Sequence, residues 1–336
     1  MMQKYENNGP APMPADEKWM DRCLQLARAG AAGAPPNPMV GAVIVHDGRI
    51  LGEGYHARCG TAHAEVNAIR AVRPDDRPLL KASTLYVSLE PCAHYGRTPP
   101  CAELIVRTGI GRVVVGCIDP FARVSGRGID ILRRAGIDVV VGVREAECRA
   151  LNSRFFTCQT QGRPYITLKW AASADGFIDR WRMSADEGPA AHLSSPRTLL
   201  RVHRLRAMHQ AILVGHATLR LDRPALTVRH WAGNDPMRIV LGAVDMDELP
   251  AGWTAYADID TALAALSQAG IQSLLVEGGE RTLQSFIDRG LWDEAWEECA
   301  SIVLGEGVPM PKMPVGVPCE NETHWGVAYR HWRNSE

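Results

Sequence analysis

The chain of 336 residues lacks an excess of charge of either sign, because 37 lysines and arginines face 38 aspartates and glutamates, for a net charge of −1. Proteins that bind nucleic acid ordinarily carry a basic surface for its phosphates, and this composition indicates none. No apolar run approaches the roughly 18 residues that a membrane-spanning helix requires. Residues 1–15 are polar and contain prolines, unlike the apolar centre of a signal peptide. We therefore expect a cytoplasmic protein with neither nucleic acid nor membrane as a partner.

The chain also lacks the cysteine pattern of a disulfide-bonded protein. Its nine cysteines are odd in number and scattered along the sequence. This usage is typical of reduced thiols in the cytosol. Hydrophobic residues make up 46% of the chain, which indicates a globular protein, and the length favours two domains with ample cores.

Two α/β patterns follow one another along the chain. After a flexible tail at residues 1–15, residues 16–158 contain a hairpin around Asp47–Gly48 and then strands that alternate with helices. This order predicts a three-layer α/β/α domain. Residues 159–336 show a second alternation of strands and helices and form a second α/β domain. The polar stretch from Asn152 to Arg163 is expected to link the two.

Residue types that bind metals occur in a fixed order in the first domain. His63 and Glu65 lie in "HAEVNAI", Cys92 follows Pro91, and eight residues separate Cys92 from Cys101. One histidine and two cysteines give zinc three protein ligands and leave its fourth position open for water. This order of histidine, glutamate and cysteines is the signature of zinc-dependent base deaminases. Cys101 is expected at a helix start, where the helix dipole favours the thiolate that zinc requires.

Glu65 has a task different from that of the three ligands. We expect it to take a proton from the attacking water and to pass protons to the ring nitrogen and the leaving amine of the substrate. A structural alternative remains open, in which Thr61 caps the helix and the cysteines lie near a core histidine by coincidence. A purely structural zinc would normally have a fourth protein ligand.

The segments "PNPMVGAVIVHDGRILGEGYH", "HAEVNAI", "LEPCAHYGRTPPC" and "SGRG" resemble the deaminase half of a family of bifunctional enzymes of riboflavin biosynthesis. These enzymes are diaminohydroxyphosphoribosylaminopyrimidine deaminases and 5-amino-6-(5-phosphoribosylamino)uracil reductases. The segments "LKWAASADG", "VGHATLRLDRPALTVR" and "VEGG" resemble the reductase half. The resemblance extends from about Asp16 to Val317.

This resemblance implies a cytidine-deaminase-like first domain and a dihydrofolate-reductase-like second domain. It implies zinc and NADPH as cofactors, a small pyrimidine ribotide as substrate, and a homo-oligomer that is a dimer or a tetramer. The implied reactions are the hydrolytic deamination of 2,5-diamino-6-ribosylamino-4(3H)-pyrimidinone 5′-phosphate and then the reduction of the ribosyl side chain to ribityl.

The resemblance also assigns residues to the deaminase site. It places the substrate against Asn37, His94, Arg97 and Asp119. An arginine at position 97 suits a phosphate on charge grounds alone, although a solvated loop arginine is the alternative. The family usually has an asparagine where this chain has Phe121, which removes one expected polar contact with the substrate.

In the reductase site, the resemblance implies two sets of contacts. The glycines of "VEGG" would let backbone amides approach a cofactor phosphate at a helix N-terminus. The substrate contacts are Lys169, Arg206, Leu226, Arg229 and Glu277, and the NADPH neighbours are Ala171, Thr218, Asp222, Gly279, Glu280, Arg281, Thr282, Leu283, Gln284 and Ser285.

Three residues of the second domain depart from the family pattern. Ala190 and His192 replace a serine and a tryptophan, and Arg223 stands beside Asp222. These departures keep two alternatives open: a homologue that serves a pathway sharing the same intermediates, such as a flavin-like or pyrimidotriazine antibiotic, or a deaminase whose reductase is impaired. An enzyme that edits bases in nucleic acid is disfavoured by the neutral charge and by the second domain.

Overall fold

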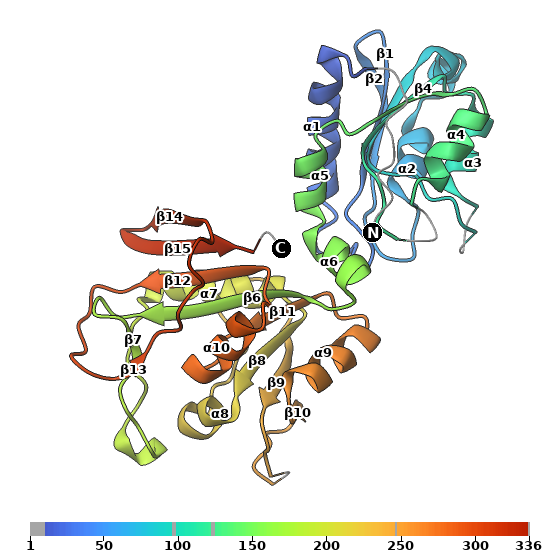
Figure 1. Ribbon diagram of the computed structural model, residues 1–336. Helices are drawn as coiled ribbons and strands as arrows, with labels where there is room; N and C mark the ends of the chain where they lie inside the picture. Colours follow the sequence, from blue (N-terminus) through green and yellow to red (C-terminus); the bar gives the residue numbers. More distant parts are fainter. Residues whose placement is uncertain (1–10, 96–98, 122–124, 246, 335–336) are drawn as a thin grey trace. The chain divides into compact units, whose positions relative to one another are not determined.

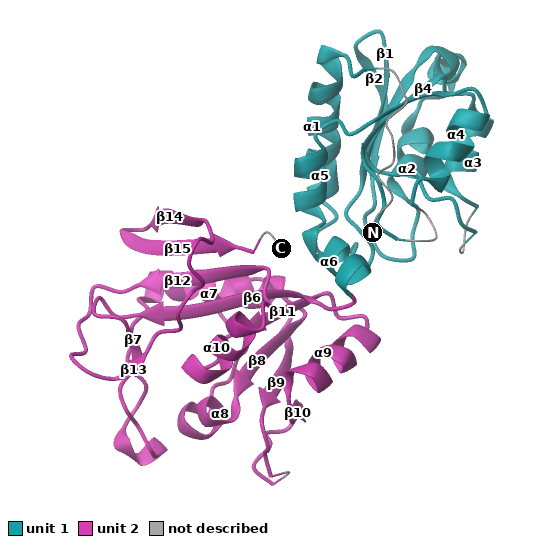
Figure 2. Cartoon of the chain, viewed as in Figure 1, with its two compact units in different colours: residues 1–161 teal, residues 162–336 magenta. Residues whose placement is uncertain are grey.

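The structure is a computed structural model that describes residues 11–95, 99–121, 125–245 and 247–334. The chain divides into two compact units, residues 1–161 and 162–336 (Figure 2). Each unit is built around its own large sheet (Figure 1). Among the residues described, no helix is both long enough and apolar enough to cross a membrane.

The segment expected to be a linker is helical. Helix α6 (Ser153–Gln161) follows α5 (Glu145–Leu151) almost without a break. The polar residues of "TCQTQ" favoured a linker, but Phe155 and Phe156 are buried and join the hydrophobic cluster under the first sheet. Their burial holds this segment as a helix of the first unit. The expected boundary after residue 158 therefore lies inside α6, whereas the two units divide between residues 161 and 162, still within the stretch expected to link them.

The first unit contains a five-stranded sheet in the order β2-β1-β3-β4-β5. The β1–β2 hairpin turns at Asp47 and Gly48, which both have positive φ, as a two-residue Asp-Gly turn requires. β1 is antiparallel to β2 and β3, whereas β3, β4 and β5 run parallel. The strands are β1 (Gly41–His46), β2 (Arg49–Tyr55), β3 (Thr84–Leu89), β4 (Arg112–Cys117) and β5 (Asp138–Val141).

Helices cover both faces of this sheet, which gives the expected three layers. The helices α1, α5 and α6 pack on one face, and α2, α3 and α4 pack on the other. Strands buried on both faces explain apolar runs such as "RVVVGC". The remaining bounds are α1 (Pro14–Arg28), α2 (Ala64–Ala71), α3 (Cys101–Thr108), α4 (Arg127–Arg134) and a 3₁₀ segment (Pro74–Ala82) before β3.

The second unit contains an eight-stranded sheet in the order β10-β9-β8-β11-β6-β12-β15-β14. The first six strands in this order run parallel, and β15 is antiparallel to both β12 and β14. A short ribbon, β7 (Phe177–Asp179) with β13 (Val308–Pro309), lies beside it. The sheet strands are β6 (Tyr165–Ala172), β8 (Ala211–Gly215), β9 (Met237–Leu241), β10 (Trp253–Tyr256), β11 (Ser273–Val276), β12 (Glu294–Cys299), β14 (Cys319–His324) and β15 (Val327–Arg333).

The helices of the second unit begin at sequence signals for helix starts. Ser195 caps α7 by accepting a hydrogen bond from the Thr198 amide, and Asp258 caps α9 in the same way. α9 and α10 pack against the larger core cluster, and α8 packs against a smaller one. The helices are α7 (Pro196–Met208), α8 (His216–Asp222), α9 (Ile259–Gln268) and α10 (Glu280–Asp288), with a 3₁₀ turn (Ala185–Glu187) before α7.

Candidate active sites

Three ends of secondary structure meet at the metal motif of the first unit. His63 is the N-cap residue of α2, Cys92 lies shortly after β3, and Cys101 is the first residue of α3. Thr61 does not cap α2, because its hydroxyl donates to the carbonyl oxygen of Arg58 at 2.7 Å. The capping alternative is therefore wrong for Thr61. With His63 itself at the cap position, its imidazole projects from the helix start toward the cysteines.

The three expected ligands come together although they are far apart in the sequence. His63 Nδ1 lies 3.6 Å from Cys92 Sγ and 3.4 Å from Cys101 Sγ. Tetrahedral zinc with bonds of about 2.0–2.3 Å would separate such atoms by about 3.5–3.8 Å. Among the described residues the cluster has these three members, and Cys59 is exposed and outside it. The donor set thus fits a zinc ion with one position left open.

The thiols of this cluster differ in how readily they ionise. The Cys101 backbone N–H donates to Cys92 Sγ at 3.3 Å. The hydrogen bond from the Cys101 side chain, with His63 close by, lowers the pKa of the Cys92 thiol. The Cys92 thiol therefore ionises more readily than an ordinary cysteine, and a cation in the cluster would favour ionisation of both thiols.

Glu65 lies beside the cluster and is almost fully enclosed. Its side chain is 3% exposed and within hydrogen-bonding reach of Cys101. Burial raises the pKa of Glu65 to about 7. A carboxyl group of this pKa can both accept and release a proton near neutral pH, which is the property that a general acid–base requires.

Glu90, to which the sequence analysis gave no role, fastens the loop that carries Asp119. Its carboxylate accepts hydrogen bonds from the backbone amides of Asp119, Gly126 and Gly128 at 3.2, 2.9 and 2.9 Å. A side chain at Gly128 would collide with the Pro91 carbonyl oxygen. The loop after β4 is therefore held closely against the segment that contains Cys92. The signal in the sequence was a glutamate at the end of a buried strand, "SLEPC".

Two of the expected substrate residues of the first site, Asp119 and His94, lie close to Phe121. Burial raises the pKa of Asp119 to about 6, and its carboxylate accepts the Phe121 amide at 2.8 Å. The Phe121 ring lies edge-on to His94, with ring centroids 6.1 Å apart. Phe121 therefore offers an aromatic edge where the family pattern offers an amide. Arg97 lies outside the described residues.

Asn37 connects to the metal motif through a buried histidine that the sequence analysis did not assign. Asn37 Nδ2 lies 3.1 Å from His56 Nε2, and His56 Nδ1 lies 3.2 Å from the Ala62 carbonyl oxygen. The His56 ring packs edge-on against His63 at 5.3 Å between centroids. Burial lowers the pKa of His56, so a neutral ring can donate to Ala62 and accept from Asn37.

The second unit brings the expected cofactor residues to neighbouring strand ends. β8 and β11 are adjacent and parallel, so α8 and α10 start side by side. Gly279 is the N-cap of α10, and a Cβ built on it would lie 3.7 Å from Thr218 Oγ1. Side chains at Gly215 or Gly278 would collide with Thr282. These glycines allow the close approach that a phosphate at a helix N-terminus requires.

The other expected cofactor residues differ in exposure. Leu283 is fully buried in the core under the sheet, so its side chain stabilises α10. Ala171 is half-buried on β6, and Gln284 Nε2 donates to Asp288. Glu280, Arg281 and Ser285 also lie on α10, where the Ser285 hydroxyl donates to the Arg281 carbonyl oxygen at 2.7 Å.

Asp222 is engaged by an arginine that the sequence analysis missed. Arg182, whose side chain is 4% exposed, contacts both Asp222 and Asp179 through Nη2. Of the residues that depart from the family pattern, Ala190 is half-buried and His192 is exposed. Arg223 is exposed and ends α8 with a φ of 43°.

A buried ion pair lies among the expected substrate residues of the second unit. Arg206 Nη2 lies 2.6 Å from Glu277 Oε2. Burial opposes ionisation of Glu277, but Arg206 and then Lys169 outweigh it and lower the pKa of this carboxyl group. The Arg229 amide donates a hydrogen bond to His203 Nδ1 at 3.0 Å. His203 in turn interacts electrostatically with both Arg206 and Glu277.

Two further expected substrate residues, Leu226 and Lys169, lie outside this ion pair. The Leu226 side chain is 3% exposed and packs in the smaller core cluster, so it can reach a substrate only through its backbone, which has a φ of 50°. Lys169 lines a small cavity together with Arg201 and Glu298. The structure therefore brings together charged groups around Glu277 that suit a phosphorylated ligand.

Comparisons with known proteins match both units. Residues 13–117 match the family "cytidine and deoxycytidylate deaminase zinc-binding region", and residues 164–319 match the "RibD C-terminal domain". The riboflavin biosynthesis protein RibD of Aquifex aeolicus is 39% identical over 325 residues, which cover 87% of this chain and 89% of that protein. These matches confirm the expected fold class, a deaminase-like three-layer domain followed by a reductase-like α/β domain.

Two solved structures resemble the chain over nearly its whole length. RibD of Acinetobacter baumannii, form 2, aligns with a TM-score of 0.80 at 30% identity and covers 95% of this chain and 98% of that one. A diaminohydroxyphosphoribosylaminopyrimidine deaminase/5-amino-6-(5-phosphoribosylamino)uracil reductase of Thermotoga maritima aligns with a TM-score of 0.79 at 32% identity, with the same coverage.

Proposed function

Because this chain belongs to the RibD family of riboflavin biosynthesis proteins, we propose that it catalyses the two reactions named for that family. The first is the hydrolytic deamination of 2,5-diamino-6-ribosylamino-4(3H)-pyrimidinone 5′-phosphate. The second is the NADPH-dependent reduction of the ribosyl side chain to ribityl. The observation that carries the proposal is the convergence of His63, Cys92 and Cys101 beside the buried Glu65.

In the deaminase reaction, His63, Cys92 and Cys101 hold zinc, which supplies a Lewis acid that lowers the pKa of water. Glu65 takes the proton of the attacking water and delivers protons to the ring nitrogen and to the leaving amine. A pKa of about 7 for the metal-free carboxyl lies close to the value that allows both transfers.

The substrate of this reaction is held by groups around Glu65. Asn37, oriented by His56, offers its amide to the pyrimidine. Asp119 and His94 line the ring, and Arg97 binds the ribose phosphate. Phe121 supplies an apolar edge beside His94, so the ring is held there by packing instead of by an amide.

In the reductase reaction, NADPH supplies the hydride. Gly279 and Thr218 receive its phosphates at the adjoining starts of α8 and α10. The other α10 residues assigned above are neighbours of the cofactor, and Leu283, whose side chain is in the core, is one only through its backbone. Lys169, Arg206 and Arg229 neutralise the phosphate of the substrate, and Glu277 holds Arg206 in place. The same proposal includes a homo-oligomer, a dimer or a tetramer.

A second candidate function, a deaminase with an impaired reductase, is favoured by one observation. Asp222, an expected neighbour of NADPH, is occupied by the buried Arg182, which also contacts Asp179. In this alternative the pairing closes part of the cofactor site.

The test supplies the diaminopyrimidine ribotide with and without NADPH and follows the products by mass spectrometry. The proposal expects exchange of an amino group for an oxo group without NADPH, and a further gain of two hydrogen atoms with it. Deamination without reduction would support the second candidate. No change in the ribotide under either condition would refute both.

A further inference from the structure

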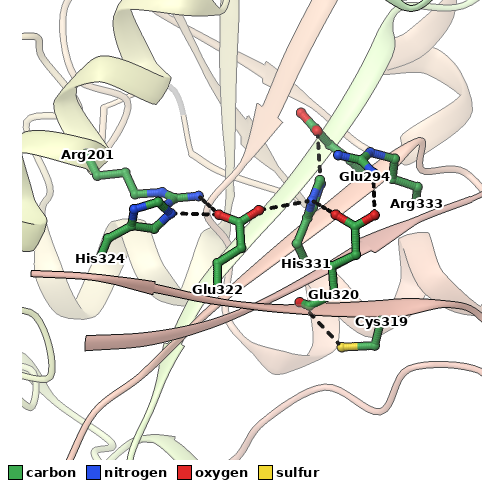
Figure 3. Close-up of polar contacts among 8 residues, drawn as sticks. All are labelled: Arg201, Glu294, Cys319, Glu320, Glu322, His324, His331 and Arg333. Carbon is green, nitrogen blue, oxygen red and sulfur yellow. Dashed lines mark hydrogen bonds and ion pairs between the residues drawn. The ribbon is translucent and has the colours of Figure 1, made fainter. Parts of the chain in front are cut away.

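A group of charged side chains in the second unit lies outside the residues assigned to either active site. Glu320 and Glu322 are on β14, and His331 is on β15. Glu320 stands directly opposite His331, and Glu322 lies two residues further along its strand, so all three side chains leave the same face of the sheet. One ligand atom from each lies within 4.8 Å of the others. Figure 3 shows Glu320 and Glu322 on either side of the His331 ring.

Each of the two carboxylates has one oxygen close to a side-chain nitrogen of a neighbour and turns the other oxygen toward His331. Glu320 Oε1 accepts a hydrogen bond from Arg333 at 2.8 Å, while Oε2 lies 3.8 Å from His331 Nδ1. Glu322 Oε2 lies 2.7 Å from His324 Nε2, while Oε1 lies 3.9 Å from His331 Nδ1. The inner separations are too long for hydrogen bonds. Separations of this length suit a nitrogen and two oxygens that all bind one atom lying between them.

The imidazole of His331 is fixed from its other side. It is 2% exposed and stacks on Trp296, with ring centroids 3.6 Å apart. Its Nε2 lies 3.3 Å from Glu294 Oε2, and Glu294 Oε1 accepts the hydroxyl of Thr167 at 2.9 Å. Nδ1 has no hydrogen-bond partner among the residues that the structure describes. A buried ring nitrogen without a partner is unfavourable, and it points between Glu320 and Glu322.

We propose that Glu320, Glu322 and His331 bind a divalent transition-metal cation and that zinc fits the site best. Bonds of about 2.0–2.2 Å to nitrogen and carboxylate oxygen would place tetrahedral ligand atoms about 3.3–3.6 Å apart. Small side-chain movements from 3.8 and 3.9 Å reach this geometry. Three ligands leave at least one position for water.

The surroundings of these ligands support the assignment. A ligating histidine commonly donates its second ring nitrogen to a carboxylate, as His331 does to Glu294. Glu294, Glu320 and Glu322 outnumber the two arginines beside them, Arg201 and Arg333, so the group has room for added positive charge. An imidazole ligand favours zinc and its neighbours over magnesium or calcium, which prefer oxygen alone.

The cation would join two neighbouring strands. β14 is the last strand of the sheet and pairs only with β15 in the described sheet order. A metal held by Glu320 and Glu322 from β14 and by His331 from β15 cross-links this hairpin. Because the folded hairpin assembles the ligands, binding stabilises the second unit by mass action.

The experiment counts zinc in the purified full-length protein after equilibration with zinc chloride and removal of free metal. We expect about two zinc ions per chain in the unmodified protein, one at each three-ligand site, and about one in His331→Ala and in Glu322→Gln. Glu322→Gln keeps the imidazole and its packing, so it answers the question even if His331→Ala fails to fold. Magnesium chloride should not displace the second ion.

Two further variants separate this site from the first. Cys92→Ser should lose the zinc of the first unit and keep that of the hairpin, so failure of one site does not obscure the other. Cys319→Ser is the matched control, because Cys319 is adjacent to Glu320 but faces the opposite side of β14, and it should still bind about two ions.

Thermal unfolding supplies a second readout. Zinc should raise the unfolding temperature of Cys92→Ser by a few degrees, and the added change Glu322→Gln should abolish this shift. The proposal is overturned if the unmodified protein holds only the zinc that Cys92→Ser removes, or if His331→Ala and Glu322→Gln retain the second ion.

Discussion

Replacing Glu65 by glutamine should remove most of the deaminase activity while the protein keeps its zinc. The side chain keeps its shape and its burial but can no longer carry a proton, so the rate of ammonia release should fall by about 10²–10⁴-fold. Zinc content should not change, because Glu65 is not among the three clustered ligand residues. An inactive variant that retains zinc would assign the proton transfers to this carboxyl group.

The same change should stabilise the metal-free protein at alkaline pH. Burial raises the pKa of Glu65 from 4.5 to about 7, so the folded state binds a proton more tightly than the unfolded state. The stability linked to this proton is complete below about pH 4.5 and is lost as the pH rises through about 7. A shift of this size corresponds to about 3 kcal/mol. Glutamine has no charge to bury, so Glu65→Gln should exceed the unmodified protein by about this amount at pH 8 and match it near pH 4.5.

Two assays check this reasoning. Ammonia release from the diaminopyrimidine ribotide, measured on zinc-loaded protein, reports catalysis. Urea unfolding of chelator-treated protein at several pH values reports stability. Ammonia release within tenfold of the unmodified rate would refute the proton-transfer role. An unfolding free energy with the same pH dependence in both proteins would refute the buried, proton-binding carboxyl group.

Three further predictions concern the metal ligands, the buried ion pair and the cofactor. Cys92→Ala and Cys101→Ala should each release the zinc of the first unit, measured by elemental analysis, whereas Cys59→Ala, an exposed thiol, should retain it. Arg206→Ala leaves Glu277 buried without its ion-pair partner and should lower the free energy of unfolding in urea by about 3–5 kcal/mol. Adding Glu277→Gln should restore this free energy without restoring reduction. An Arg206→Ala variant as stable as the unmodified protein would contradict the pairing. Titration followed by tryptophan fluorescence should show tighter binding of NADPH than of NADH, and binding of neither would indicate that reductase function is lost.

Much of the fold follows from local sequence. The Asp47–Gly48 turn, the apolar strand β4 and the cap of α9 are each set by the residues that form them. The order of His63, Glu65, Cys92 and Cys101 likewise predicted which residues would cluster in the first unit, because metal-ligand chemistry requires those residue types, and the structure brings the three expected ligands together. Helix α6 was not predicted, because its sequence is mostly polar. Its two phenylalanines, Phe155 and Phe156, are buried only because the sheet lies beneath them.

Other features could not be predicted because they depend on contacts between distant segments. Glu90 has its role only because the loop after β4 directs several backbone amides at one carboxylate. Arg182 reaches Asp222 across 40 positions of the sequence.

The sequence by itself determined the two α/β domains, the residue types expected to bind a metal and the family resemblance, because periodicity and ligand chemistry are local properties. Tertiary structure alone decided which polar residues act together. β14 reads "CENETH" and shows no apolar alternation, yet pairing with β15 places Glu320 opposite His331. The physical reason is strand register. It brings side chains from separate segments within a few ångströms, and no feature of either segment specifies that register in isolation.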